Sequence, residues 1–254
     1  MNNDLVRIGT AVSVATSTVA TSFFSGNPDR KNRRQLYKIQ QKIFDKNLII
    51  PANATFVLIW PVIYTGTVAL AVHQALPSQR DNPRYRQARP WLLVCYALNA
   101  LFGYYFSKKS RSARIGSSIT TMATLPPALL LHHALEIGQT EVAQPEQTFR
   151  KAVSLYAGWL TVASVVSSAN LLIENGFRPS SAASVRWASA ALPATLALGV
   201  AVARRLRDPY YLVPFSVGFA GIAAKQAKRE PTVAKLAAAG AVGAAAWIVR
   251  RLVR

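Results

Sequence analysis

The chain has 254 residues, of which 51% are hydrophobic and only 16% are charged. Soluble domains usually carry about a quarter charged residues, so this composition argues against an ordinary soluble protein. The formal net charge of +20 suits either nucleic acid or anionic lipid. The basic residues alternate with apolar runs instead of forming one basic face, which favours a lipid bilayer as partner and argues against nucleic acid.

The apolar runs, taken in chain order, predict eight transmembrane helices, because a span needs about 20 mostly apolar residues. The expected spans are residues 5–25, 54–76, 91–106, 115–135, 153–173, 185–203, 210–224 and 233–249. The third, seventh and eighth are short, so one or two of them are candidates for re-entrant or interfacial segments. The sequence therefore predicts an all-α, polytopic membrane bundle, that is, a multi-pass integral membrane protein, and leaves the membrane itself unidentified.

The connecting segments are polar and mostly basic. Residues 27–46 carry apolar side chains at helical spacing with lysines on the other faces, which is typical of a basic amphipathic helix on a membrane surface or of a solvated helical linker. Residues 77–90 contain three prolines and predict a loop. By a small margin, the distribution of Arg and Lys over the connections favours termini on the non-cytoplasmic side.

Residues that could carry chemistry are sparse. The ten acidic residues all lie in loops or at the edges of the predicted spans, and no nucleophile stands in a known catalytic motif. Cys95 is the single cysteine, which excludes a disulfide framework. His73, His132 and His133 are either metal or haem ligands or polar residues at helix ends, and we favour the second interpretation. The sequence therefore predicts no catalytic residue and no metal site.

Small residues recur in the last predicted span. Ala239 with Gly243, and Gly240 with Ala244, give the spacing that lets helix backbones approach closely in lipid. Such a face either packs within its own bundle or docks a second copy or a partner membrane protein. A non-catalytic scaffold or subunit is therefore one hypothesis for this chain.

Prolines and aromatic residues suggest a different hypothesis. Pro61, Pro126, Pro127 and Pro193 lie inside predicted spans, where prolines kink helices and open cavities in a bundle. Aromatic side chains that line such a cavity suit a flat hydrophobic ligand. The alternative is that these aromatic residues only anchor the helices at the two membrane surfaces.

Three short motifs stand in an order typical of one family. They are PANATFVLIWPVIY at 51–64, ALN at 97–99 followed by Phe102 and Phe106, and YAGW at 156–159 followed by Asn170. This order resembles the tryptophan-rich sensory protein family (TspO/MBR), also called the translocator protein or peripheral-type benzodiazepine receptor family. The chain departs from the family pattern at Ala54, where the family has a tryptophan, and at Ser167, where it has an asparagine.

The resemblance implies a five-helix membrane core over residues 1–176 and a three-helix extension over residues 177–254. It also implies binding of a tetrapyrrole, such as haem or a porphyrin, or of a sterol-like ligand, as a sensor or carrier. The residues that would line the pocket are Trp60, Tyr64, Asn99, Phe102, Tyr156 and Trp159. Tetrapyrrole breakdown has been credited to family members, yet the sequence offers no residues for it, so we expect binding without catalysis.

Overall fold

The computed structural model describes residues 3–26 and 30–253, and every regular element within these ranges is helical. The long helices are α1 (Asn3–Gly26), α2 (Arg30–Phe44), α3 (Asn53–His73), α4 (Pro83–Phe106), α5 (Arg111–Ala134), α6 (Glu146–Glu174), α7 (Ser181–Leu206), α8 (Val213–Gln226) and α9 (Pro231–Leu252). Two short 3₁₀ helices, η1 (Pro77–Gln79) and η2 (Pro209–Leu212), precede α4 and α8. The all-α fold class is thereby confirmed.

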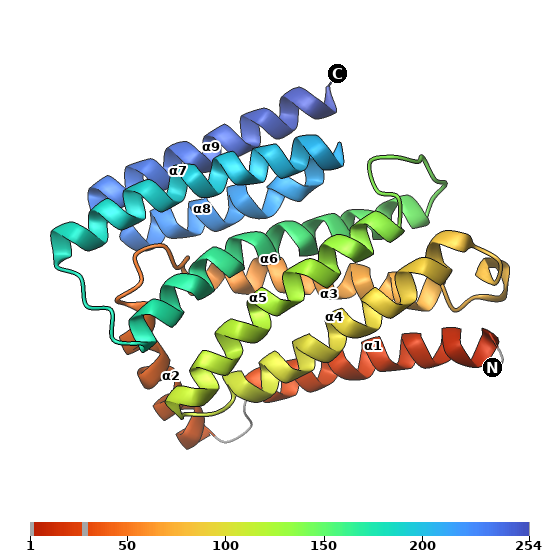
Figure 1. The fold of residues 1–254 in the computed structure, drawn as a ribbon, viewed down its shortest axis with the longest axis horizontal. Helices are drawn as coiled ribbons and strands as arrows, with labels where there is room; N and C mark the ends of the chain where they lie inside the picture. Colours follow the sequence, from red (N-terminus) through yellow and green to blue (C-terminus); the bar gives the residue numbers. More distant parts are fainter. Residues whose placement is uncertain (1–2, 27–29, 254) are drawn as a thin grey trace.

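Five of these helices form a closed ring. α1 packs against α3 and α4, α4 against α5, α5 against α6, and α6 returns to α3 (Figure 1). α6 is the most buried of the four helices that are apolar enough to cross a membrane, and Tyr156, Ala157 and Val153 on it are fully buried. This arrangement leaves the interior of the ring bounded by α1, α3, α4, α5 and α6.

The last three helices form a layer outside the ring, on the side of α6 and α3 (Figure 1). α8 packs against α6 and α3, and α9 packs against α8 and α7. The layer approaches α6 closely at Gly158, where a Cβ atom would lie only 2.0 Å from the carbonyl oxygen of Tyr211. A buried pair, His132 Nε2 with Asp208 Oδ2 at 2.9 Å, also joins α5 to this layer.

Each predicted span falls within or across a helix, but the segment over residues 77–90 is not a loop as predicted. α4 begins at Pro83 and continues through Pro90. Asn82 caps it by accepting a hydrogen bond from the backbone N–H of Arg84, and proline at the first helical position costs no hydrogen bond. Arg84 in turn donates to both oxygens of Glu146, at 3.0 and 3.2 Å. These hydrogen bonds raise the pKa of Arg84.

Four of the described helices, α3, α6, α7 and α9, are long and apolar enough to cross a membrane. α1, α4 and α5 carry more polar residues, and α8 has only 14 residues. Of the predicted amphipathic segment over residues 27–46, residues 27–29 lie outside the described ranges, and Arg30–Phe44 form α2, which contacts α6 at one end of the ring. Figure 1 shows α2 lying across that end, beside the α4–α5 connection.

Candidate ligand-binding cavity

A cavity of about 510 Å³ lies inside the ring at the end nearest α2. This volume is within the range of sites that enclose drug-sized ligands. We call it the aromatic cavity, and its aromatic lining residues are Phe44, Phe56, Trp60, Tyr64, Phe102, Phe106 and Trp159. They come from α2, α3, α4 and α6, so the cavity depends on the closure of the ring.

Two tryptophans and a tyrosine form one aromatic wall. Trp60 and Tyr64, one turn apart on α3, are stacked with ring centroids 4.9 Å apart. Trp159 on α6 meets Trp60 edge to face at 6.2 Å, and Phe56 meets Trp159 in the same way at 5.5 Å. Stacked and edge-to-face rings hold each other in place, so this wall is a rigid apolar surface.

Asn99 and Tyr156 do not line the aromatic cavity, unlike the other four predicted site residues. Both side chains are buried, and the Tyr156 hydroxyl donates to Asn99 Oδ1 at 3.1 Å across the α4–α6 contact. The Tyr156 ring lies 6.4 Å from that of Trp60. These two residues therefore support the aromatic wall from behind.

The opposite side of the cavity is polar, and the sequence analysis did not single it out as a site. Its lining includes Ser117, Ser118 and Thr121 of α5 and Ser167 and Asn170 of α6. Ser117 and Thr121 donate their hydroxyl protons to helix carbonyl oxygens, which leaves the hydroxyl oxygens as acceptors. The spacing of four residues between Ser117 and Thr121 was the available signal, since it puts both on one helix face.

Asn170 also connects the cavity to the segment before α3. Asn47 Nδ2 donates to Asn170 Oδ1 at 2.7 Å and to the carbonyl oxygen of Val166 at 3.1 Å. Asn170 therefore ties the α2–α3 connection to α6. Ser167, at the position where the family pattern has asparagine, lines the cavity, so that departure changes the lining itself.

The presence of Ala54 where the family has a tryptophan has a different consequence. Ala54 is exposed on α3 and does not line the cavity, whereas its neighbours Asn53 and Phe56 do. The missing tryptophan therefore removes an outward-facing ring and leaves the aromatic wall intact.

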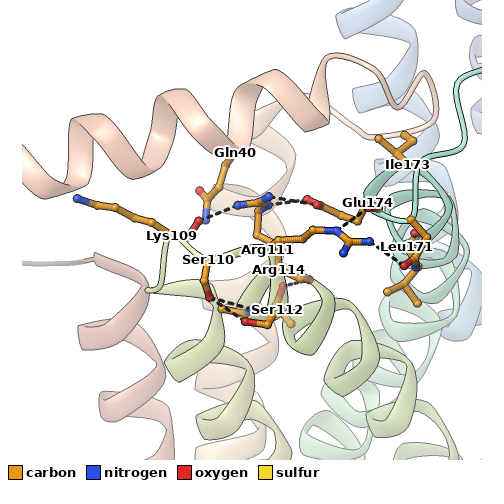
Figure 2. Close-up of polar contacts among 12 residues, drawn as sticks. Gln40, Lys109, Ser110, Arg111, Ser112, Arg114, Leu171, Ile173 and Glu174 are labelled. Carbon is orange, nitrogen blue, oxygen red and sulfur yellow. Dashed lines mark hydrogen bonds and ion pairs between the residues drawn. The ribbon is translucent and has the colours of Figure 1, made fainter.

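A network of charges ties the helix ends beside the cavity (Figure 2). Arg114 Nε and Nη2 contact the two oxygens of Glu174 at 2.5 and 3.1 Å, which fixes the start of α5 against the end of α6. Arg111 donates to the carbonyl oxygen of Glu174 at 2.8 Å. Gln40 of α2, a cavity residue, donates to the carbonyl oxygen of Phe106 at 3.1 Å. The network thus holds α2, α4, α5 and α6 around one end of the cavity.

The described lining of the aromatic cavity offers no histidine that could hold a haem iron. Its described residues include no His, Cys or Met, although haem iron usually takes such an axial ligand. His132, in the last turn of α5, is fully buried in its pair with Asp208, and the Nδ1 atom of His73 lies 2.7 Å from the Tyr85 hydroxyl. Within residues 3–26 and 30–253, no three His, Cys, Asp or Glu side chains cluster as a metal site.

One of three comparisons with known proteins found a match. A search of curated proteins and a search of solved structures each returned no match. The family model described as TSPO-like protein matches residues 8–250, through the ring and the C-terminal helices alike. With four helices apolar enough to cross a membrane, this match identifies an integral membrane protein. The chain belongs to the TSPO-like protein family.

Proposed function

We propose that the protein binds a flat apolar ligand, a tetrapyrrole or a sterol-like molecule, in the aromatic cavity and acts as a sensor or carrier of it. The observation that carries this proposal is the stacked wall of Trp60, Tyr64 and Trp159 beside a void of about 510 Å³. Flat rings placed against such a wall gain both burial of apolar area and ring–ring contact.

The polar side of the cavity suits the polar edge of such a ligand. The oxygens of Ser117 and Thr121 are placed to accept hydrogen bonds from pyrrole N–H groups or from a sterol hydroxyl. Propionate groups would extend toward α2, whose Gln40 and Gln41 line the cavity and carry amide N–H donors. The proposed ligand class and the proposed orientation of the ligand both follow from the separation of the lining into an aromatic wall and a polar side.

The arrangement of the helices supports eight membrane crossings. α1, α4 and α5 lie alongside α3 and α6 in one ring, and they expose apolar side chains such as Val12, Leu101 and Ile119. Exposed apolar residues beside membrane-spanning helices favour the same hydrocarbon layer, because the lipid removes them from water. η2 and α8 together provide the seventh, broken crossing. The division into residues 1–176 and 177–254 stays a prediction of the sequence.

A second candidate is a non-catalytic subunit that docks a second copy or a partner membrane protein through α9. Of the two small-residue faces predicted there, Gly240 and Ala244 are buried, and Gly240 packs against Phe219. Ala239 and Gly243 are exposed. The exposed face formed by Ala239 and Gly243 is therefore open to packing against another membrane protein.

Titration of the purified protein with protoporphyrin IX tests the first proposal. We expect saturable quenching of tryptophan fluorescence at micromolar ligand, reduced in a Trp60→Phe, Trp159→Phe double variant and retained in a Trp247→Phe control. Quenching that does not saturate, or that is equal in all three proteins, would contradict binding in the aromatic cavity.

A further inference from the structure

A second cavity, also of about 510 Å³, lies on another side of α6. It is bounded by the α2–α3 connection, the end of α6, the start of α7 and the α8–α9 connection. It shares no lining residue with the aromatic cavity, because Ser167 and Asn170 face one and Ser168 and Ala169 face the other. We call it the α6–α7 cavity.

One side of the α6–α7 cavity is apolar and reaches the outer surface of the bundle. Leu172, Phe177 and Trp187 line it and are 49%, 41% and 60% exposed. The rings of Phe177 and Trp187 meet edge to face at 6.3 Å. α7, which carries Trp187, is among the helices able to cross a membrane, so this side faces the acyl chains of the bilayer. An exposed tryptophan near a helix end is typical of the headgroup level.

The rim of the same cavity carries cations whose charges are not neutralised locally. Lys46 has no ion-pair partner among the described residues. Arg178 donates to the carbonyl oxygens of Ile173 and Phe177, at 2.5 and 3.1 Å, and also has no carboxylate partner in the described ranges. Arg229 is paired with Asp45, and Glu230 lines the cavity as well. The lining therefore holds one more cation than anion.

The start of α7 adds a further preference for negative charge. Ser181 and Ser184, in its first turn, line the cavity. The free N–H groups and the dipole of a 26-residue helix favour an anion at this end. Apolar walls open to lipid thus meet a positive rim within one cavity, which is the shape and charge of a lipid binding site.

We propose that the α6–α7 cavity binds one anionic phospholipid. Its phosphate lies between Lys46 and Arg178, and an acyl chain lies along Leu172, Phe177 and Trp187. This site is separate from the aromatic cavity and does not depend on porphyrin or sterol binding there.

Native mass spectrometry of the full chain in detergent, titrated with dioleoyl phosphatidylglycerol, tests the site. We expect one tightly retained lipid and about thirtyfold weaker binding in a Lys46→Gln, Arg178→Gln double variant, given the contribution of each of the two cations near a lipid phosphate. The matched control is Lys108→Gln with Lys235→Gln, which removes two exposed charges from the same end of the bundle. Equal affinity in the two double variants would overturn the proposal.

Two further measurements test the site without changing a charge on the protein. Ala169→Phe should fill the α6–α7 cavity and weaken lipid binding, while Ala163→Phe, which faces the aromatic cavity, should not. Dioleoyl phosphatidylcholine and glycerol phosphate should each bind at least tenfold more weakly than the anionic lipid. If either binds as tightly, the cavity does not recognise an anionic lipid. Unchanged melting temperatures in detergent show that the variants are folded.

Discussion

The rings of Trp60 and Tyr64 stack at 4.9 Å with their planes 22° apart, and both line the aromatic cavity. Replacing Trp60 by Ala removes the stacking partner and a large part of the apolar wall. We expect about tenfold weaker protoporphyrin binding, since such an aromatic contact contributes about 1 kcal/mol beyond its area. Fluorescence titration through the remaining tryptophans measures the change. Trp247→Ala, on α9, is the control, and an equal loss in both variants would contradict the assignment.

Tyr156→Phe tests the support behind the wall. Asn99 Oδ1 would lose the hydroxyl that donates to it, and the Asn99 Nδ2 atom already has no partner among the described residues. An unpaired buried polar group costs about 1–3 kcal/mol, so we expect a lower melting temperature in detergent. Tyr105→Phe, on the same helix as Asn99, changes a hydroxyl outside this contact and should leave the melting temperature unchanged. Equal melting of the two variants would show that the Asn99 contact contributes nothing.

Two ion pairs at the same end of the bundle should differ in their contribution to stability. Glu174 is buried against Arg114, whereas Asp45 and Arg229 are both about half exposed. Glu174→Gln should lower the free energy of unfolding by about 2 kcal/mol, while Asp45→Asn should lower it by less than about 1 kcal/mol. Thermal unfolding of both variants compares them. A larger effect from Asp45→Asn would contradict the structure of the charge network in Figure 2.

The two glycines on α9 separate internal packing from docking. A Cβ atom added at Gly240 would lie 2.4 Å from a ring carbon of Phe219. A Cβ atom added at Gly243 would lie 3.8 Å from its nearest neighbour, a methyl carbon of Leu196. Gly240→Ala should therefore destabilise the fold by about 1–3 kcal/mol. Gly243→Leu should leave stability unchanged and, if α9 docks a second copy, shift the oligomer seen on a native gel. An unchanged gel pattern would count against the docking role.

The proposed crossings of α4 and α5 are open to labelling. Cys95 is buried, so single cysteines placed at Asp81, Lys108 and Glu141 would be the reactive ones. In sealed vesicles, an impermeant thiol reagent should label positions 81 and 141 from one side and position 108 from the other. Labelling of all three from the same side would contradict the proposed crossings of both helices.

Hydropathy in the sequence was enough to predict the apolar helices, and the motif order was enough to predict the aromatic wall. Trp60, Tyr64, Phe102 and Trp159 come together because residues on one face of each helix point into a closed ring. The start of α4 was missed because Pro83 and Pro90 dominated the pattern, although Asn82 before a proline is a helix start signal. Burial of Asn99 and Tyr156 behind the wall depends on how α4 and α6 meet, which helical spacing alone does not fix.

The contribution of α2 to the cavity was not foreseen either. Its amphipathic pattern predicts an apolar face but not the surface that covers it. In the structure Leu36 is buried and lines the cavity, and Gln40 bonds to α4. The sequence also did not predict that polar residues of α5 line the cavity, because Ser and Thr within apolar helices usually bond to their own helix.

The most direct test of ligand binding compares two substitutions on one helix. Ala163→Phe places a ring in the aromatic cavity, and Ala169→Phe places the same ring in the α6–α7 cavity. Protoporphyrin titration should give a dissociation constant at least tenfold higher for Ala163→Phe and an unchanged one for Ala169→Phe. An unchanged constant for Ala163→Phe would contradict the assignment of the aromatic cavity as the ligand site.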